Sequence, residues 1–202
     1  MYDEGYSICP CFWGTKPAWL VEAARSYFPG FDNVRVLDIG CGDGKNAYFL
    51  ASLGAQVRAV DISPLAIEHA KCAWPSLQNL TWEVGDIRHL HFLIDFFDII
   101  VATGILHCLK DKVEMKAVIH RMKSATKQGG FNIISAFNTR FQDLSGHGPH
   151  FHPCLLPHSF YVEAYNDWEV IHKSDKDLDD IHPHNQILHH HSITRILARN
   201  TW

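Results

Sequence analysis

Five short apolar runs that alternate with helix-like segments constrain the fold of this chain more than any other feature. The runs lie at 34–39, 56–61, 80–84, 97–102 and 131–136. The first run is almost entirely apolar, which is typical of a strand buried on both faces of a sheet. Because each run is followed by a helical segment, the pattern predicts βαβ units and a parallel sheet.

Start signals between the runs support the predicted helices. Ser63 is a favourable N-cap and Pro64 a favourable first helical residue, so we expect a helix that ends near residue 73. Asp111 is a second N-cap, with Glu114 in the position of a capping box. The sequence predicts two further helices, at 16–28 and 45–53.

The alternation loosens after residue 138. A short helix is expected at 159–165, and two more strands at 168–173 and 190–198. Such a hairpin-like pair at the end of a parallel sheet runs antiparallel. We therefore expect an α/β fold with a seven-stranded, mostly parallel sheet, an antiparallel edge strand, and helices on both faces.

Composition restricts the class of protein. The chain has 202 residues, 47% of them apolar and 20% charged, which fits a single globular domain. The net charge of -4 and the lack of a long apolar run predict no nucleic-acid or membrane partner. The acidic start at 1–4 differs from a signal peptide, and the six cysteines are irregularly spaced, so we expect a cytoplasmic protein with reduced thiols. Composition leaves monomer and homodimer equally open.

The loop after the first predicted strand carries most of the functional information. Residues 38–44 read Asp-Ile-Gly-Cys-Gly-Asp-Gly, and glycines at such a place let the backbone approach a ligand. A dinucleotide-binding loop reads Gly-x-Gly-x-x-Gly, which would place its third glycine at position 45; here that residue is Lys45, and the glycines read Gly-x-Gly-x-Gly. Asp38 and Asp43 would repel a pyrophosphate, whereas they suit a ligand that carries an amine and a sulfonium.

Two more carboxylates follow the next strands. Asp61 ends the second strand, where a carboxylate can accept hydrogen bonds from both ribose hydroxyls. Asp86 follows the third strand and can accept from an adenine amino group. The sequence therefore predicts an adenosine ligand without phosphate.

As a set, these features resemble the class I S-adenosylmethionine-dependent methyltransferases over residues 34–136. The resemblance implies a Rossmann-like fold, S-adenosyl-L-methionine as cofactor and S-adenosyl-L-homocysteine as product. It also implies a single domain, in which residues 1–33 form an arm and helix over the cofactor, 34–137 bind it, and 138–202 form the substrate side. The cofactor-binding residues expected on this basis are Asp38, Gly40, Cys41, Gly42, Gly44, Asp61, Ile62, Asp86, Ile87, Thr103 and Trp13. The aromatic faces of Tyr6, Phe12 and Trp13 either attract the sulfonium or simply pack the arm.

The C-terminal third is similar to the tellurite-resistance (TehB-like) methyltransferases. The similarity lies in Gly-Gly-Phe-Asn-Ile-Ile at 129–134, in Trp-Glu at 168–169 and in the ending at 196–199. That family has a His-Arg pair before its last strand and an arginine within it. Here His182-Pro183 stand at the pair, and the strand carries His190, His191 and Ser192, so the histidine is kept and the arginines are not. The resemblance implies methyl transfer to a small molecule, such as tellurite or selenite.

Several alternatives stay open. Instead of a chalcogen oxyanion, the methyl acceptor could be an organic thiol, amine or carboxylate, or an arsenic species bound by cysteines. A non-catalytic module that binds S-adenosylmethionine is a further reading, and a nicotinamide-dependent oxidoreductase is disfavoured by Lys45.

The histidines supply the candidate catalytic residues. His107 follows the fourth strand, at the loop that faces the transferred methyl group in this fold, and His182 matches the family's histidine. Either one is alternatively a structural histidine. The histidines of 147–154 and 189–191 do not have a standard zinc spacing, so we expect no metal site. Alternation along a strand allows at most two residues of 189–191 to line one site.

Overall fold

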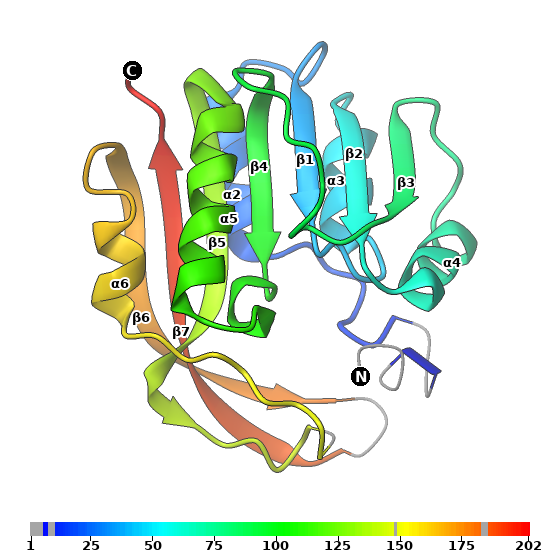
Figure 1. Cartoon of the computed structure of the whole chain (residues 1–202). Helices are drawn as coiled ribbons and strands as arrows, with labels where there is room; N and C mark the ends of the chain where they lie inside the picture. The colour runs from blue at the N-terminus through cyan, green and yellow to red at the C-terminus, as the bar shows by residue number, and fades with distance from the viewer. Residues whose placement is uncertain (1–5, 8–10, 148, 183–185) are drawn as a thin grey trace.

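The computed structural model describes residues 6–7, 11–147, 149–182 and 186–202. Of the positions discussed above, 1–4 and Pro183 lie outside this range. The described chain forms a seven-stranded sheet in the order β3-β2-β1-β4-β5-β7-β6, with helices on both faces (Figure 1). The strands are β1 (Arg35–Ile39), β2 (Gln56–Asp61), β3 (Leu80–Val84), β4 (Phe97–Thr103), β5 (Thr126–Gln142), β6 (Glu169–Ile181) and β7 (Leu188–Arg199). The helices are α2 (Trp19–Ala24), α3 (Lys45–Ser52), α4 (Pro64–Ala73), α5 (Lys112–Ala125) and α6 (His158–Glu163), with 3-10 turns η1 (Arg25–Tyr27) and η2 (Leu106–Cys108).

The predicted mostly parallel sheet is confirmed. Strands β3, β2, β1, β4 and β5 pair in parallel, and β7 pairs antiparallel with both β5 and β6. The order of the strands changes direction between β1 and β4. From β1 the sheet continues through β2 and β3 on one side, and from β4 through β5, β7 and β6 on the other. Ligands of open α/β sheets bind at such a switch point, beside the carboxyl ends of the strands.

Local signals explain where most helices begin. The Ser63 hydroxyl accepts a hydrogen bond from the Ala66 N–H at 3.0 Å, as expected of an N-cap. The Asp111 carboxylate accepts from two backbone N–H groups at the start of α5, each at 2.9 Å. The Glu114 carboxylate reaches the Lys110 N–H at 2.7 Å, one residue before the expected capping-box partner.

The helix expected at 16–28 is shorter in the structure. It comprises α2 and the 3-10 turn η1, and it begins only after Pro17. Proline disfavours helical backbone in the residue before it, which explains the later start.

Two apolar clusters hold the helices to the sheet. On one face, α5 and α6 bury Met115, Met122 and Phe160 against β4 and β5. On the other face, α2, α3 and α4 bury Val21, Leu50 and Ile67. Burial of each such side chain contributes roughly 1.5–3 kcal/mol. Among the described residues, no helix has the length and apolar character needed to span a membrane.

The last three strands are longer than the sequence suggests. The expected runs at 131–136, 168–173 and 190–198 become β5, β6 and β7, which extend past the edge at which β1 to β4 end (Figure 1). Polar residues such as Asp177 and Ser192 lie in register in the β6–β7 extension, so the apolar pattern used for prediction does not mark it. The extension brings the start of β7 and the end of β6 to the ligand-binding edge of the sheet.

Candidate functional site

The glycine loop leaves β1 and enters α3. Gly40, Gly42 and Gly44 have φ angles of 65°, 54° and 83°, a region that side chains with a Cβ rarely adopt. A Cβ added to Gly44 would lie 2.2 Å from the ring of Trp82. The Gly40 and Cys41 N–H groups both donate to the Val60 carbonyl, at 2.8 and 3.1 Å. The loop therefore has one conformation that only glycines at these positions permit.

Asp38 lies on β1 directly beneath this loop. Its side chain is completely buried, and within the described part of the chain neither carboxylate oxygen has a partner at normal hydrogen-bond geometry; a weaker backbone interaction with Ala47 favours the charged form. Burial, followed by the negative charge of Asp61, raises the pKa of Asp38 to about 8. A buried carboxylate without a partner is costly, so this group suits a ligand with a positively charged donor such as an α-amino group.

Asp61 ends β2 and faces the same loop. One of its oxygens accepts from the Gly42 N–H at 2.8 Å and the other from the Ser63 N–H at 2.9 Å. The carboxylate is thus held rigidly by backbone groups at the end of β2, where the hydroxyls of a diol such as ribose would meet it.

Three aromatic residues from the N-terminal arm cover the loop. A Cβ built on Gly42 would lie 2.8 Å from the Tyr6 hydroxyl oxygen, which also accepts from the Trp13 indole N–H at 3.1 Å. The Lys45 ammonium donates to the Trp13 carbonyl at 2.6 Å. Lys45, which departs from the dinucleotide pattern, thus anchors the arm. That the arm covers a bound cofactor stays a prediction.

Asp86 and Ile87 follow β3, but their side chains have protein partners. The Asp86 carboxylate accepts from the Arg88 N–H at 2.9 Å and from its guanidinium at 2.5 Å. These bonds lower the pKa of Asp86. Ile87 is buried in the apolar core, and Ile62 is 41% exposed near the end of β2. An adenine contact by Asp86 would have to share the carboxylate with Arg88, so this role remains a prediction.

Thr103, at the end of β4, is part of a series of hydrogen bonds that passes through Asn46, a residue that the sequence analysis did not single out. The Thr103 hydroxyl accepts from the Asn46 amide at 2.8 Å, and the Asn46 carbonyl accepts from the Ala18 N–H at 2.8 Å. Asn46 is buried on the first turn of α3. Asn46 connects the start of α2 to the glycine loop. A polar residue on the otherwise apolar buried face of α3 is the sequence feature that could have indicated this role.

His107 lies in η2, where it is buried rather than open to a ligand. Its ring stacks on Phe137 with centroids 4.3 Å apart, and Nδ1 accepts from the Phe137 N–H at 3.2 Å. Burial, then the nearby His191, lowers the pKa of His107 to about 3. In the neutral ring the proton is therefore on Nε2, and proton abstraction by Nδ1 would require the backbone hydrogen bond to break.

His182 connects the arm to a group of histidines. It is buried, stacks on Phe12 at 4.8 Å and meets Trp13 edge-on at 5.3 Å. Its ring also lies 4.7 Å from His147 and 4.8 Å from His189. The strand alternation expected for 189–191 is confirmed, because His189 and His191 are buried on one side and His190 points away toward Asp179.

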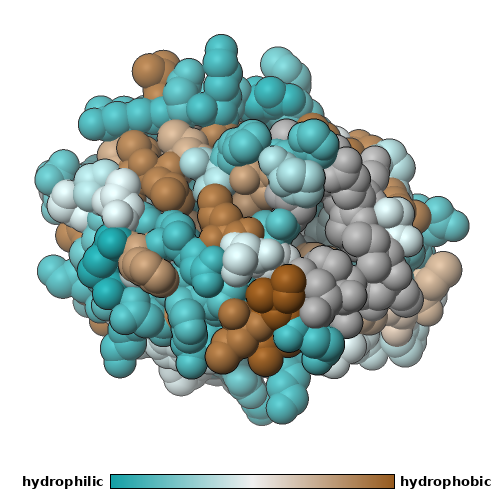
Figure 2. Space-filling view, turned by 90° about the horizontal axis from the view of Figure 1, so that it is seen from below, coloured by the Kyte–Doolittle hydropathy of each residue, from teal (hydrophilic) through white to brown (hydrophobic). Residues whose placement is uncertain are grey.

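The surface at this edge is mixed in character. Figure 2 views the molecule from the side at which β1 to β4 end, and hydrophobic patches alternate there with hydrophilic ones.

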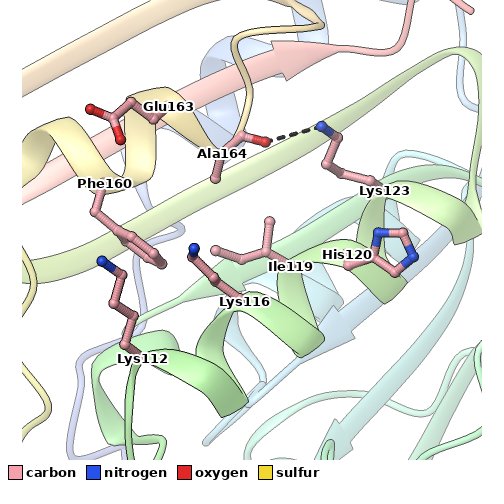
Figure 3. A pocket seen from close by; sticks show the side chains of 8 residues that line it. All are labelled: Lys112, Lys116, Ile119, His120, Lys123, Phe160, Glu163 and Ala164. Atoms are coloured by element: carbon pink, nitrogen blue, oxygen red, sulfur yellow. Dashed lines mark hydrogen bonds between the residues drawn. The ribbon is translucent and has the colours of Figure 1, made fainter.

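A separate hollow of about 290 Å³ lies between α5 and α6 (Figure 3). Lys112, Lys116 and Lys123 line it, and the Lys123 ammonium donates to the Ala164 carbonyl at 3.0 Å. It contains no residue of the glycine loop, so it is distinct from the candidate cofactor site.

Comparison with known proteins agrees with this geometry. Residues 36–130 match the family described as "Methyltransferase domain". Together with the fold, this match shows that residues 36–130 carry a methyltransferase domain, and the sheet topology is that of the class I S-adenosylmethionine-dependent methyltransferases, whose cofactor is S-adenosyl-L-methionine. More particularly, it is similar to the probable S-adenosyl-L-methionine-dependent methyltransferase TehB of Haemophilus influenzae, at 29% identity over 171 residues, which are 81% of this chain and 54% of TehB. The TehB crystal structure superposes with a TM-score of 0.68 at 24% identity, covering 90% of this chain and 61% of that one.

Two other proteins extend the comparison. Hemagglutinin 1 of Eikenella corrodens is 33% identical over 158 residues, 74% of this chain and 47% of that protein. The chain thus spans about half the length of the curated relatives it matches. A further solved structure is that of the N-methyltransferase NodS of Bradyrhizobium japonicum in complex with S-adenosyl-L-homocysteine. It superposes with a TM-score of 0.66 at 17% identity, and the match covers 91% of this chain and 85% of the NodS chain. The expected class I fold is confirmed.

Proposed function

We propose that this protein transfers a methyl group from S-adenosyl-L-methionine to a small-molecule acceptor. The observation that carries the proposal is the pair of carboxylates at the glycine loop: Asp38, buried with no partner at normal hydrogen-bond geometry among the described residues, and Asp61, fixed by two backbone N–H groups. The Asp38 carboxylate would bind the amino group of the cofactor, and Asp61 the ribose hydroxyls. When bound, the cofactor supplies an electrophilic methyl group on a good leaving group, so the protein mainly aligns the reactants and excludes water.

On the acceptor side the described residues gather histidines, with Asp180 beside His182 and His189. His107, His147, His182 and His191 are at least partly buried, and burial lowers the pKa of His147 to about 3 and of His191 to about 4. Neutral imidazoles can donate hydrogen bonds to an anion but offer no fixed positive charge. This environment favours a soft nucleophile with a free lone pair, such as selenite, tellurite or a thiolate, because such acceptors need little base catalysis. Similarity to TehB supports the chalcogen oxyanions, and an organic thiol is the next candidate.

Calorimetric titration of the metal-free protein tests the cofactor first. We expect micromolar binding of S-adenosylmethionine and S-adenosylhomocysteine, lost in Asp61→Ala and retained in Glu68→Gln, an exposed acidic residue of α4 that serves as matched control. Transfer of a labelled methyl group is then followed with selenite, tellurite, thiols, amines and carboxylates as acceptors. Binding without transfer to any of them would favour a non-catalytic module instead.

A further inference from the structure

Four histidines that lie far apart in the sequence converge beside the N-terminal arm. His189 and His191 are on β7, His182 follows β6, and His147 lies in the loop after β5. The Nε2 atoms of His147 and His191 are 3.0 Å apart, and the rings of His147 and His189 are 5.1 Å apart. One potential ligand atom from each of His147, His189 and His191 lies within 4.8 Å of the other two.

The tautomer of His191 follows from its neighbour Gln142. The Gln142 amide nitrogen donates to the Asn138 and Ser192 carbonyls, both at 2.8 Å, so the amide oxygen must face the histidine. That oxygen is 2.7 Å from His191 Nδ1, which therefore carries the proton. In the neutral ring the Nε2 lone pair of His191 then points toward His147.

His189 reaches the same arrangement through the backbone. Its Nδ1 lies 2.8 Å from the Ile187 carbonyl, which can only accept, so Nδ1 is the donor. The unprotonated Nε2 is buried, and no hydrogen bond reaches it from the described part of the chain. The loop backbone packs tightly on this ring, since a Cβ added to Gly146 would lie 2.2 Å from Nδ1. A buried acceptor without a donor is the feature that calls for a ligand here.

In the neutral rings the Nε2 atoms of His189 and His191 are thus both unprotonated, and these rings lie 4.9 Å apart, with the His147 ring 5.1 Å from His189 and 5.0 Å from His191. Metal-bound histidines have this organisation: the remaining ring N–H donates to a carbonyl or an amide oxygen, which orients the ligand nitrogen. Around a tetrahedral ion with metal–nitrogen distances of about 2.0–2.1 Å, ligand nitrogens lie roughly 3.4 Å apart. Small side-chain rotations bring the three present nitrogens to that spacing.

We propose that His147, His189 and His191 form a binding site for a divalent transition metal ion of the zinc type. Three imidazole ligands leave one coordination position, as in zinc sites that bind a reactant. Asp180 and His182, which lie with His189 in an overlapping group of potential ligand atoms, stand beside it. This proposal departs from the expectation of no metal site, which rested on spacing in the sequence alone.

The place of the site gives the ion a use that rests on the proposed function. His182 packs against Phe12 and Trp13 of the arm over the glycine loop, so the ion would lie on the acceptor side of the cofactor. A zinc ion binds thiolates and oxyanions and lowers the pKa of a coordinated acid. It would hold the methyl acceptor as its anion without a fixed positive side chain.

The test is a zinc titration of the full chain produced without a histidine tag and stripped with a chelator. Competition with a chromogenic chelator gives the affinity, and elemental analysis gives the stoichiometry. We expect one equivalent of zinc, and at least a hundredfold weaker binding in His189→Ala/His191→Ala. His190→Ala is the matched control, because this neighbour points away from the cluster toward Asp179 and should leave zinc affinity unchanged.

A second variant covers the case in which the double substitution does not fold. Gln142→Leu keeps all the histidines but removes the acceptor that orients His191, and we expect roughly tenfold or greater loss of zinc affinity. Thermal unfolding checks that this variant is folded, and tetrahedral cobalt absorption reports the ligand set directly. Two results would overturn the proposal: a wild type that does not bind one equivalent of zinc, or equal zinc affinity in the wild type and in whichever of Gln142→Leu and His189→Ala/His191→Ala is folded. Because no cofactor is used, failure of this test leaves the proposed methyl transfer separately testable.

Discussion

Replacement of the buried Asp38 by asparagine should make the protein more stable and at the same time unable to hold its cofactor well. The pKa of this carboxyl is ordinarily 3.8, and it rises to about 8 in the folded chain. Between these two pH values the Asp38 carboxyl loses its proton in the unfolded state but keeps it in the folded state. Ionisation lowers the free energy of the unfolded state, so the free energy of unfolding falls as the pH rises. Below about pH 4 both states are protonated and the penalty vanishes.

The size of the penalty follows from the shift. At pH 7 Asp38 is still protonated in the folded state, because its pKa there is about 8. In the unfolded state its pKa of 3.8 lies about three units below the pH. At 1.36 kcal/mol per unit, the folded state is therefore penalised by about 4 kcal/mol. Asparagine removes this penalty, but its amide still lacks hydrogen bonds, which costs about 1–3 kcal/mol. We therefore expect a net gain of about 1–3 kcal/mol, or roughly 2–12 °C in Tm for a chain of this length.

Thermal unfolding of the wild type and Asp38→Asn at pH 4, 5.5, 7 and 8.5 measures this directly. The difference in Tm should be smallest at pH 4 and grow until about pH 8. S-adenosylmethionine at 1,000 times its Kd should reverse the order, since it adds about 4.1 kcal/mol to the protein that binds it, more than the gain expected for Asp38→Asn. A difference that does not change with pH, or a variant that binds the cofactor as well as the wild type, would refute the reasoning about Asp38.

Three further outcomes are expected. Asp61→Ala should weaken S-adenosylmethionine binding at least tenfold by calorimetry, and an unchanged Kd would remove Asp61 from the site. His107→Ala should lower turnover more than cofactor affinity in a methyl-transfer assay; wild-type turnover would restrict His107 to its packing on Phe137. Gly44→Ala should destabilise the protein by about 2 kcal/mol or more in denaturant unfolding, because it combines a left-handed φ with overpacking in a close contact; a stability equal to that of the wild type would show that the loop relaxes.

Much of the fold could be predicted because its signals are local. Ser63 and Asp111 cap helices through their own side chains, and the apolar strands β1 and β4 are recognisable from a few consecutive residues. The lengths of β5, β6 and β7 could not be predicted in this way. Their extensions are stabilised by strand pairing between polar residues, a contact that leaves no periodic apolar pattern.

The candidate site divides in the same manner. The prediction that Asp38, Asp61 and the glycine loop lie together holds, because parallel strands end at one edge and carry their following loops to it. The partner of Asp86 was not foreseen, since Arg88 is brought onto the carboxylate by the turn that follows β3. Asn46 was missed as well, because its role depends on contacts with two other elements.

The sequence by itself determined the order of strands and helices, the left-handed glycines and the identity of the acidic strand ends, because each depends on backbone preferences within a few residues. Only the tertiary structure decided that His147 and His189 meet and that Gln142 orients His191. Strand alternation places His189 and His191 on one face, but the register of β7 against β5 and the path of the loop at 143–147 decide what stands opposite them. Such contacts arise from packing between segments more than forty residues apart, and no spacing within either segment records them.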